Sequence, residues 1–316
     1  MSERWGARRG ALASSMTRNA SLQSYLTIRW LADRAYRADA FALYAYFRWL
    51  DDTVDEHLVE KDLRLAFVGR QRTLLSRALA GGTVLGTTVE EELLVGLVRR
   101  DLARATNVGL LLSLRSMFDV MEFDARRRGC QVSQAELDAY THDLAVAVTE
   151  ALHQCIGHGR RSPHDETRYV AVTGAHIAHM LRDLAEDLGS GYRNVPAGLL
   201  DEGPVDLEDL HAPAVRAWVR DRVELARSCF ATGRRSLVQV ESVRCRFAGH
   251  AYIARFEWVL DAIERDGYRV RASYPERATL RGGVRIAADG ARSALAAARA
   301  RPGSASRGAG RPTGAR

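Results

Sequence analysis

The chain has 316 residues, of which 47% are hydrophobic, and a formal net charge of +7. This length and apolar content are sufficient for one large core or two modest ones. No stretch reaches 18 uncharged apolar residues, and the N-terminal end has arginines but no continuous apolar core of a signal peptide, so we expect a soluble, unprocessed, cytoplasmic protein.

The positive charge is concentrated at the C-terminal end. From Gly290 onward the sequence has six arginines and no acidic residue, whereas the rest of the chain is nearly neutral. The segment is rich in Ala, Gly, Pro and Ser, and Leu295 is its single large aliphatic residue, a composition typical of disorder. We therefore expect residues 289–316 to form a disordered Arg/Ala/Gly-rich tail. A solubilising role fits this tail better than contact with RNA or anionic lipid, and we expect no nucleic-acid partner.

Helical periodicity dominates the remainder. Residues 1–15 are polar and are expected to form a flexible N-terminus. From Ala20 onward apolar residues recur with the period of a helix, and no useful alternating strand pattern is present. Ser133 followed by Glu136 fits a capping box at one helix start. The predicted helices cover residues 20–33, 38–56, 61–80, 89–101, 107–128, 133–158, 165–189, 213–240 and 244–267.

These elements predict a single all-α domain over residues 16–288, because the connections are short and no linker precedes residue 290. Several other classes of site are absent from the sequence. It has no GxxxxGK[ST] loop, no GxGxxG motif after a strand and no GxSxG motif, which argues against nucleotide dependence and a serine hydrolase. Four scattered cysteines form no CxxC pair, and no HExxH motif supports zinc binding by the histidines.

Two polar helix faces stand out within apolar, aromatic-rich segments. In the first, Tyr44, Arg48, Asp51 and Asp55 fall within about 60° of arc on an ideal helix. Acidic residues four positions apart usually belong to a solvated face. Here the segment from Phe41 to Leu50 is aromatic and apolar, and burying unpaired carboxylates in it would be costly.

The second face has the same design. His176, His179, Asp183 and Asp187 fall within about 80° of arc on an ideal helix. Carboxylates four residues apart repel each other unless they share a cation. Mg²⁺ is the cation that keeps several waters and completes its shell with substrate phosphate oxygens. If the two faces oppose each other across a cavity, we therefore expect a Mg²⁺ site for a diphosphate.

The sequence resembles the squalene/phytoene synthases, all-α enzymes that use Mg²⁺ to join prenyl diphosphates head to head. The resemblance covers about residues 21–268 and implies an isoprenoid-synthase-like bundle with a central cavity. The matching segments are Ser24-Tyr25, Tyr44-x-x-x-Arg48-x-x-Asp51-Asp52-x-x-Asp55, Met121-Glu122-Phe-Asp124, Tyr140, Leu181-Arg182-Asp183-x-x-Glu186-Asp187, and Pro196 with Leu199-Leu200.

The resemblance also implies roles for individual residues. Asp51, Asp55, Asp183 and Asp187 would hold Mg²⁺. Arg48 and Arg182 would contact diphosphate oxygens, together with Ser24 and Tyr25 as substrate-binding residues. Tyr44 and Tyr140 would border the reacting carbons. The donor would be geranyl, farnesyl or geranylgeranyl diphosphate, and its hydrophobic product suggests at most peripheral contact with a membrane.

Three departures from the family pattern leave the acceptor open. His176 and His179 replace the family's Gln and Asn, so that His179 could bind metal or carry a proton. Val146 and Thr149 stand where the family has glycines, and Phe256 replaces a tyrosine. The expected activity is a prenyltransferase that couples the donor to a second prenyl diphosphate. One alternative is an aromatic acceptor, such as a carbazole or an indole, with His176 or His179 taking the proton. Another is an inactive scaffold.

Overall fold

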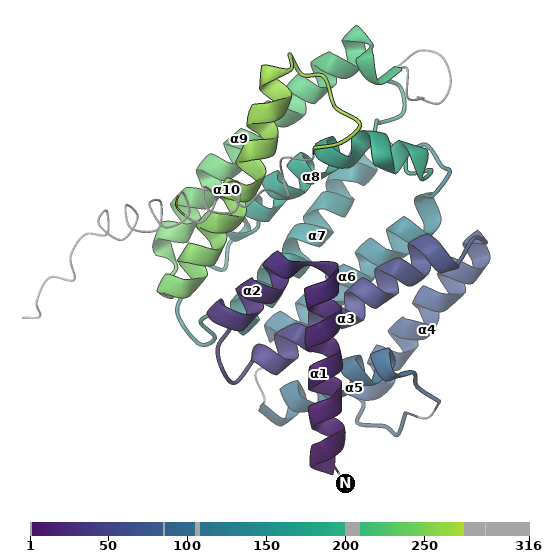
Figure 1. Ribbon diagram of the computed structural model, residues 1–316, viewed down its shortest axis with the longest axis vertical. Helices are drawn as coiled ribbons and strands as arrows, with labels where there is room; N and C mark the ends of the chain where they lie inside the picture. Colours follow the sequence, from purple (N-terminus) through teal and green to yellow (C-terminus); the bar gives the residue numbers. More distant parts are fainter. Residues whose placement is uncertain (1, 85, 105–107, 200–208, 275–287, 289–316) are drawn as a thin grey trace, which may run out of the picture.

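A computed structural model describes residues 2–84, 86–104, 108–199, 209–274 and 288. These residues form an all-α bundle, as predicted, and contain no β-strand (Figure 1). The helices are α1 (Ser2–Ala20), α2 (Leu22–Leu31), α3 (Arg37–Asp52), α4 (Lys61–Leu79), α5 (Val89–Arg104), α6 (Val108–Arg127), α7 (Gln134–Cys155), α8 (Val170–Gly189), α9 (Pro213–Gln239) and α10 (Val243–Arg265).

The predicted helices correspond to α2–α10 with small shifts at their ends. The capping box at Ser133 is confirmed, because the backbone N–H of Glu136 bonds to the Ser133 hydroxyl and the Glu136 carboxylate accepts from the backbone N–H of Ser133. Residues 2–20 form helix α1, which is not among the predicted helices, and its Ala13 and Thr17 are buried against the bundle. The predicted C-terminal tail lies outside the described residues.

The helices pack around two principal cores. One core is built mainly from α3, α4, α5 and α6 and includes Tyr46 and Phe118. The other is built from α8, α9 and α10 and includes Phe230 and Leu260. Helix α7 packs on both α6 and α8, so it joins the two halves (Figure 1). The helices that carry the two polar faces, α3 and α8, therefore belong to different halves of the molecule.

Glycines allow α8 and α9 to pack closely. A Cβ at Gly174 would lie 2.9 Å from the Ala226 carbonyl oxygen, and a Cβ at Gly233 would lie 2.6 Å from the Ala171 Cβ. Neither position has room for a side chain, so the second polar face is held against a closely fitted neighbour. Among the described residues, no helix combines the length and apolar content needed to cross a bilayer.

Candidate active site

The first acidic face lies at the C-terminal end of α3. Asp51 and Asp52 are partly buried, and both accept from the guanidinium of Arg48, with 3.1 Å between Arg48 Nη1 and Asp51 Oδ2. Burial raises the pKa of Asp51 to about 7, and the negative charge of Asp55 adds to this rise. One arginine thus does not neutralise the cluster, which retains an excess of negative charge at neutral pH.

The predicted helix 38–56 is α-helical only as far as Asp52. Thr53–His57 form a π-helical turn, which is wider than an α-helical turn and changes the direction of Asp55. The Asp55 carboxylate accepts a hydrogen bond from the Tyr192 hydroxyl, and its backbone carbonyl accepts from Arg128 Nη1 at 2.8 Å. Asp55 is therefore oriented by residues outside its own helix.

The second acidic face lies on α8. Arg182 Nε and Nη2 both donate to the Asp183 carboxylate, and His179 Nε2 lies 2.9 Å from Asp183 Oδ2. Although burial opposes the change, these hydrogen bonds hold the pKa of Asp183 below its usual range. One turn further on, burial raises the pKa of Asp187 to about 7, and the charge of Asp183 adds to the rise.

Asp124 and Arg127, near the end of α6, connect the two faces. Arg127 Nε donates to Asp124 Oδ1 at 2.7 Å, and the Tyr140 hydroxyl donates to Asp124 Oδ2 at 3.0 Å. Arg127 also donates to the Asn194 side-chain oxygen, and Asn194 Nδ2 donates to Asp187 Oδ2 at 2.7 Å. This hydrogen-bonded chain runs from Tyr140 on α7 to Asp187 on α8.

The charge of Asp124 acts on both acidic faces. It raises the pKa of Asp51 on α3 and that of Asp187 on α8, in both cases as a smaller effect than burial. Tyr192 and Asn194, two residues apart in one segment, bind Asp55 of the first motif and Asp187 of the second. These two carboxylates are thereby brought near each other between the two halves of the bundle, with Asp124 and Arg127 beside them.

Six residues of this network were not among the predicted site residues: Asp52, Asp124, Arg127, Arg128, Tyr192 and Asn194. Asp52 and Asp124 were noted only as parts of matching segments. Tyr192 and Asn194 are buried in the segment after α8, where no helical period marks them. That segment is fixed to the α6–α7 connection, because the Gly129 N–H donates to the Gly191 carbonyl at 2.8 Å and the Ala197 N–H donates to the Val132 carbonyl at 2.7 Å.

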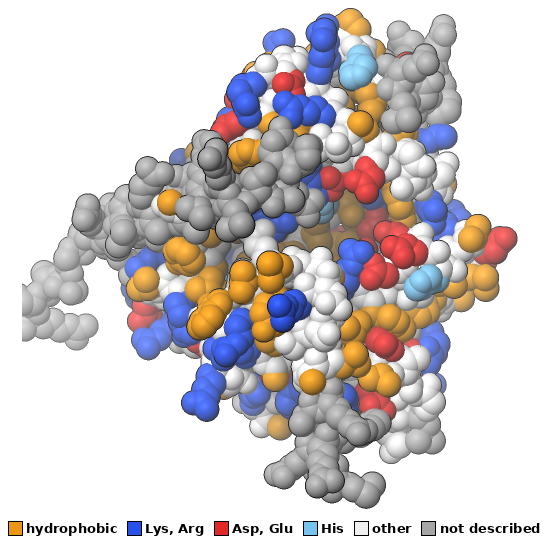
Figure 2. Space-filling model, in the orientation of Figure 1, with side chains coloured by type: hydrophobic (Ala, Val, Ile, Leu, Met, Phe, Trp, Pro, Cys, Tyr) orange, Lys and Arg blue, Asp and Glu red, His pale blue; other side chains and the backbone are white. Residues whose placement is uncertain are grey.

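Next to these charges lies a hollow with aromatic walls. The His179 side chain is 48% exposed, yet burial lowers its pKa. The two properties coexist where a side chain borders a space that protein surrounds on most sides. Tyr140 and Tyr252 are likewise partly exposed, while burial raises the pKa of each hydroxyl. Figure 2 shows a recess between the positions of α8 and α3, with apolar side chains in its depth and charged side chains at its rim.

Ring contacts connect these walls. The His176 ring lies 5.0 Å from the Tyr140 ring and 6.4 Å from the His179 ring. The series continues to Phe256, at 6.1 Å from His179, and to Tyr252, at 5.1 Å from Phe256. His176 is 6% exposed and neither of its ring nitrogens has a hydrogen-bond partner, while burial lowers its pKa well below the usual range. Burial therefore favours the neutral form of both imidazoles.

The remaining predicted residues lie on helices that border this region. Tyr44 is partly buried one turn before Arg48 on α3. Ser24 and Tyr25 lie on α2, and the Tyr25 ring packs 5.6 Å from that of Phe41. Among the described residues, Ser24 and Tyr25 contact Ser21, Phe41 and Arg18 rather than the carboxylates of the two motifs.

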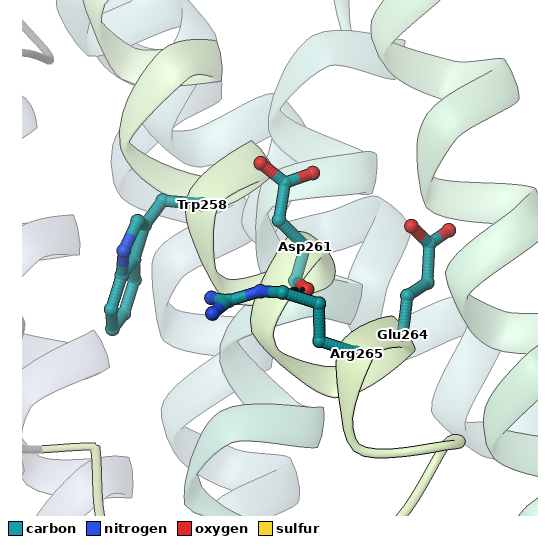
Figure 3. Close-up of a pocket in the computed structure, with 4 residues that line it drawn as sticks. All are labelled: Trp258, Asp261, Glu264 and Arg265. Atoms are coloured by element: carbon teal, nitrogen blue, oxygen red, sulfur yellow. Dashed lines mark hydrogen bonds between the residues drawn. The ribbon is translucent and has the colours of Figure 1, made fainter.

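A second depression, of about 440 Å³, lies on the outside of α10 (Figure 3). It is lined by Trp258, Asp261, Glu264 and Arg265, and none of the predicted site residues contributes to it. Asp261 and Glu264 are both paired with Arg227 of α9. These acids are thus part of the α9–α10 contact, and the depression is separate from the candidate active site.

The side chains around Asp124 offer carboxylate oxygens, which are protein ligands that Mg²⁺ prefers. In the described part of the chain, no three histidine, cysteine or carboxylate side chains lie close enough together to hold a metal ion by themselves. Mg²⁺ usually takes only one or two protein carboxylates and completes its octahedron with water and phosphate oxygens. Burial, with a smaller contribution from neighbouring carboxylates, raises the pKa values of Asp51 and Asp187, and a bound cation would favour the ionised form of both.

Comparisons with known proteins agree with this architecture. The model of the family described as "Squalene/phytoene synthase" matches residues 17–284. The fold is similar to that of squalene synthase HpnC from Alicyclobacillus acidocaldarius, with a TM-score of 0.64 and 22% identity over 83% of this chain and 95% of that one. It is also similar to TcSQS in complex with the ligand BPH1237, with a TM-score of 0.61 and 14% identity over 94% of this chain and 93% of that one. A search of curated protein sequences finds no match.

The fold is all-α, and the family whose model matches is one of prenyl-transferring enzymes. The chain belongs to the squalene/phytoene synthase family, because the family model covers most of its length. The resemblance noted in the sequence is thereby confirmed, and transferase activity in isoprenoid biosynthesis follows at the level of the family.

Proposed function

We propose that this protein is a Mg²⁺-dependent prenyltransferase that ionises an allylic prenyl diphosphate, forms a C–C bond and releases diphosphate. The observation that carries the proposal is the gathering of both acidic motifs around Asp124 and Arg127, beside an aromatic hollow. Asp51, Asp55, Asp183 and Asp187 would hold Mg²⁺, with His179 as a further candidate ligand. Bound Mg²⁺ would neutralise charge that develops on the diphosphate.

Other residues of the chain would bind the diphosphate and stabilise the carbocation. Arg48 and Arg182 lie beside the two acidic motifs and would stabilise the departing diphosphate. The rings of Tyr140, His176 and Phe256 would face the carbocation, which aromatic faces attract and which the apolar hollow would protect from water. Tyr44, on the same helix face as Arg48, would border the reacting carbons.

The two neutral histidines favour a second candidate function, in which the acceptor is an aromatic ring rather than a second prenyl diphosphate. Alkylation of an aromatic ring ends with loss of a proton, and a neutral imidazole can accept it. His179 has this protonation state and is exposed to the hollow. Val146 and Thr149 are both buried on α7, so their side chains fill interior space that glycines would leave open.

Diphosphate release tests the proposal. Purified protein with Mg²⁺ and geranyl, farnesyl or geranylgeranyl diphosphate should release diphosphate, and EDTA should abolish the release. We expect Asp51→Asn and Asp183→Asn each to lower the rate at least about 100-fold, because each removes a charge that holds the cation. Asp138→Asn is the matched control, because that carboxylate is 60% exposed on α7. Absence of release with every donor would instead support the scaffold.

His179→Ala separates ionisation from the acceptor step. If His179 takes a proton, this variant should still release diphosphate but lose the coupled product, and water should capture the cation. Mass spectrometry of products formed with and without a carbazole or indole nucleophile identifies the acceptor. Equal loss of diphosphate release in His179→Ala and Asp183→Asn would contradict this division of roles and place His179 with the metal ligands.

A further inference from the structure

Helix α2 presents two different faces. Tyr25, Ile28 and Leu31 are partly buried against the bundle. Leu22, Leu26 and Trp30 recur at intervals of four residues on the other side, where they are 57%, 43% and 66% exposed. On a helix these three positions share a stripe about 80° wide. Scattered exposed apolar residues are ordinary, but an aligned stripe that contains a tryptophan is not.

The stripe continues onto the start of α10. Val243 is 65% exposed, and the next residue, Arg244, donates to the Leu31 carbonyl at the end of α2. The four side chains Leu22, Leu26, Trp30 and Val243 are called the α2 patch below. Figure 2 shows hydrophobic side chains grouped with basic ones around the position that α2 occupies in Figure 1.

The surroundings of the α2 patch are basic. Arg29 on α2 and Arg34, four residues after Trp30, are both exposed, and the guanidinium carbon of Arg29 lies 5.2 Å from the centre of the Trp30 ring. Between residues 19 and 38 the single acidic residue is Asp33, which is paired with Arg244. A tryptophan among aliphatic side chains with arginines around them is the combination that binds the interface of an anionic bilayer.

We propose that the α2 patch docks this protein on an anionic lipid bilayer. Charge complementarity selects this occupant. A second copy would bring the same arginines face to face, and the C-terminal segment from Gly290 onward contains six arginines and no acid. Trp30 and the leucines would enter the headgroup region, while the arginines contact lipid phosphates. Tyr25, on the opposite side of the same helix, would then lie between the bilayer and the bundle.

Vesicle flotation tests this docking without substrate or metal, so its outcome is independent of the proposed function. The full chain should float with phosphatidylcholine vesicles containing 30% phosphatidylglycerol and bind pure phosphatidylcholine much more weakly. Leu26→Glu/Trp30→Glu should reduce the partition at least about tenfold, because it replaces two apolar anchors by charges that the bilayer repels. Arg29→Glu/Arg34→Glu should reduce the partition by about fivefold or more for each arginine and weaken its salt dependence. Leu225→Glu, at an exposed leucine on α9, is the control and should float like wild type.

A second measurement covers the possibility that the double variant misfolds. Brominated lipids should quench tryptophan fluorescence of the wild-type protein more than that of Trp30→Phe. The proposal is overturned if wild type fails to float, or if the folded Leu26→Glu/Trp30→Glu variant floats equally well. It is also overturned if, without vesicles, wild type forms a dimer that this variant does not form, because a second copy would then cover the patch.

Discussion

Asp124 and Arg127 have a position that neither acidic motif has alone. Asp124 accepts from Arg127 and from Tyr140, and its charge raises the pKa of a carboxylate in each motif. The two motifs could be predicted because a spacing of four residues between acidic side chains can be read directly from the sequence. The residues that join them were not, because Tyr192 and Asn194 come from an irregular segment whose position depends on backbone bonds to the α6–α7 connection.

Asp187 gives a prediction about pH. Burial raises its pKa from 3.8 to about 7, so between these values the folded state holds a proton that the unfolded state has released. Stability from this group is therefore present at low pH and is lost as the pH rises through 7. In EDTA, the melting temperature of Asp187→Asn relative to wild type should increase from pH 5.5 to pH 8. A difference that stays constant or shrinks with pH would contradict the prediction.

At the scale of elements, the order and extent of α2–α10 could be predicted because strong apolar periods and Gly, Pro and Ser breaks mark them. Two features at this scale, helix α1 and the π-helical turn, could not be predicted. Helix α1 has a polar sequence, and it depends on burial of Ala13 and Thr17 against other helices. The π-helical turn Thr53–His57 carries no local signal, because the groups that bind Asp55 come from distant segments.

The α8–α9 contact gives a prediction at this scale. Gly233→Ala should destabilise the protein by about 1–2 kcal/mol, because overpacking costs about 1–3 kcal/mol and exceeds the helix propensity that alanine gains. The new Cβ would lie 2.6 Å from the Ala171 Cβ. Gly69→Ala on α4 is the control, with no atom within 4 Å of the new Cβ, and should stabilise by about 0.5–1 kcal/mol. Urea denaturation measures both, and equal effects would show that the contact is not tight.

At the scale of the molecule, the sequence predicted an all-α bundle, and this was confirmed. The division into two cores joined by α7 was not predicted, because helical periods show which face is apolar but not which partner it meets. The candidate site lies where the two cores adjoin, with Asp51 on α3 from one half and Asp187 on α8 from the other.

A ligand that spans both halves should therefore stabilise the whole fold. Mg²⁺ together with pyrophosphate should raise the melting temperature. The free energy of unfolding should increase by about 2.7 kcal/mol when the ligand concentration is 100 times its Kd. Either component alone should do less, because Mg²⁺ completes its shell with phosphate oxygens. Differential scanning fluorimetry measures the shift, with Asp51→Asn as the variant that should lose it. An undiminished shift in Asp51→Asn would locate the cation elsewhere.

The π-helical turn at Thr53–His57 divides the first acidic motif into two parts that are held in place by different contacts. Side chains before it follow the register of α3, which the core around Tyr46 fixes, whereas Asp55 follows Arg128 and Tyr192. Loss of one residue from this turn would restore an α-helical winding and rotate Asp55 away from its partners while Arg48 and Asp51 kept their places. The length of this turn therefore sets the orientation of the Asp55 carboxylate, while Val54 in the same turn ties it to the core.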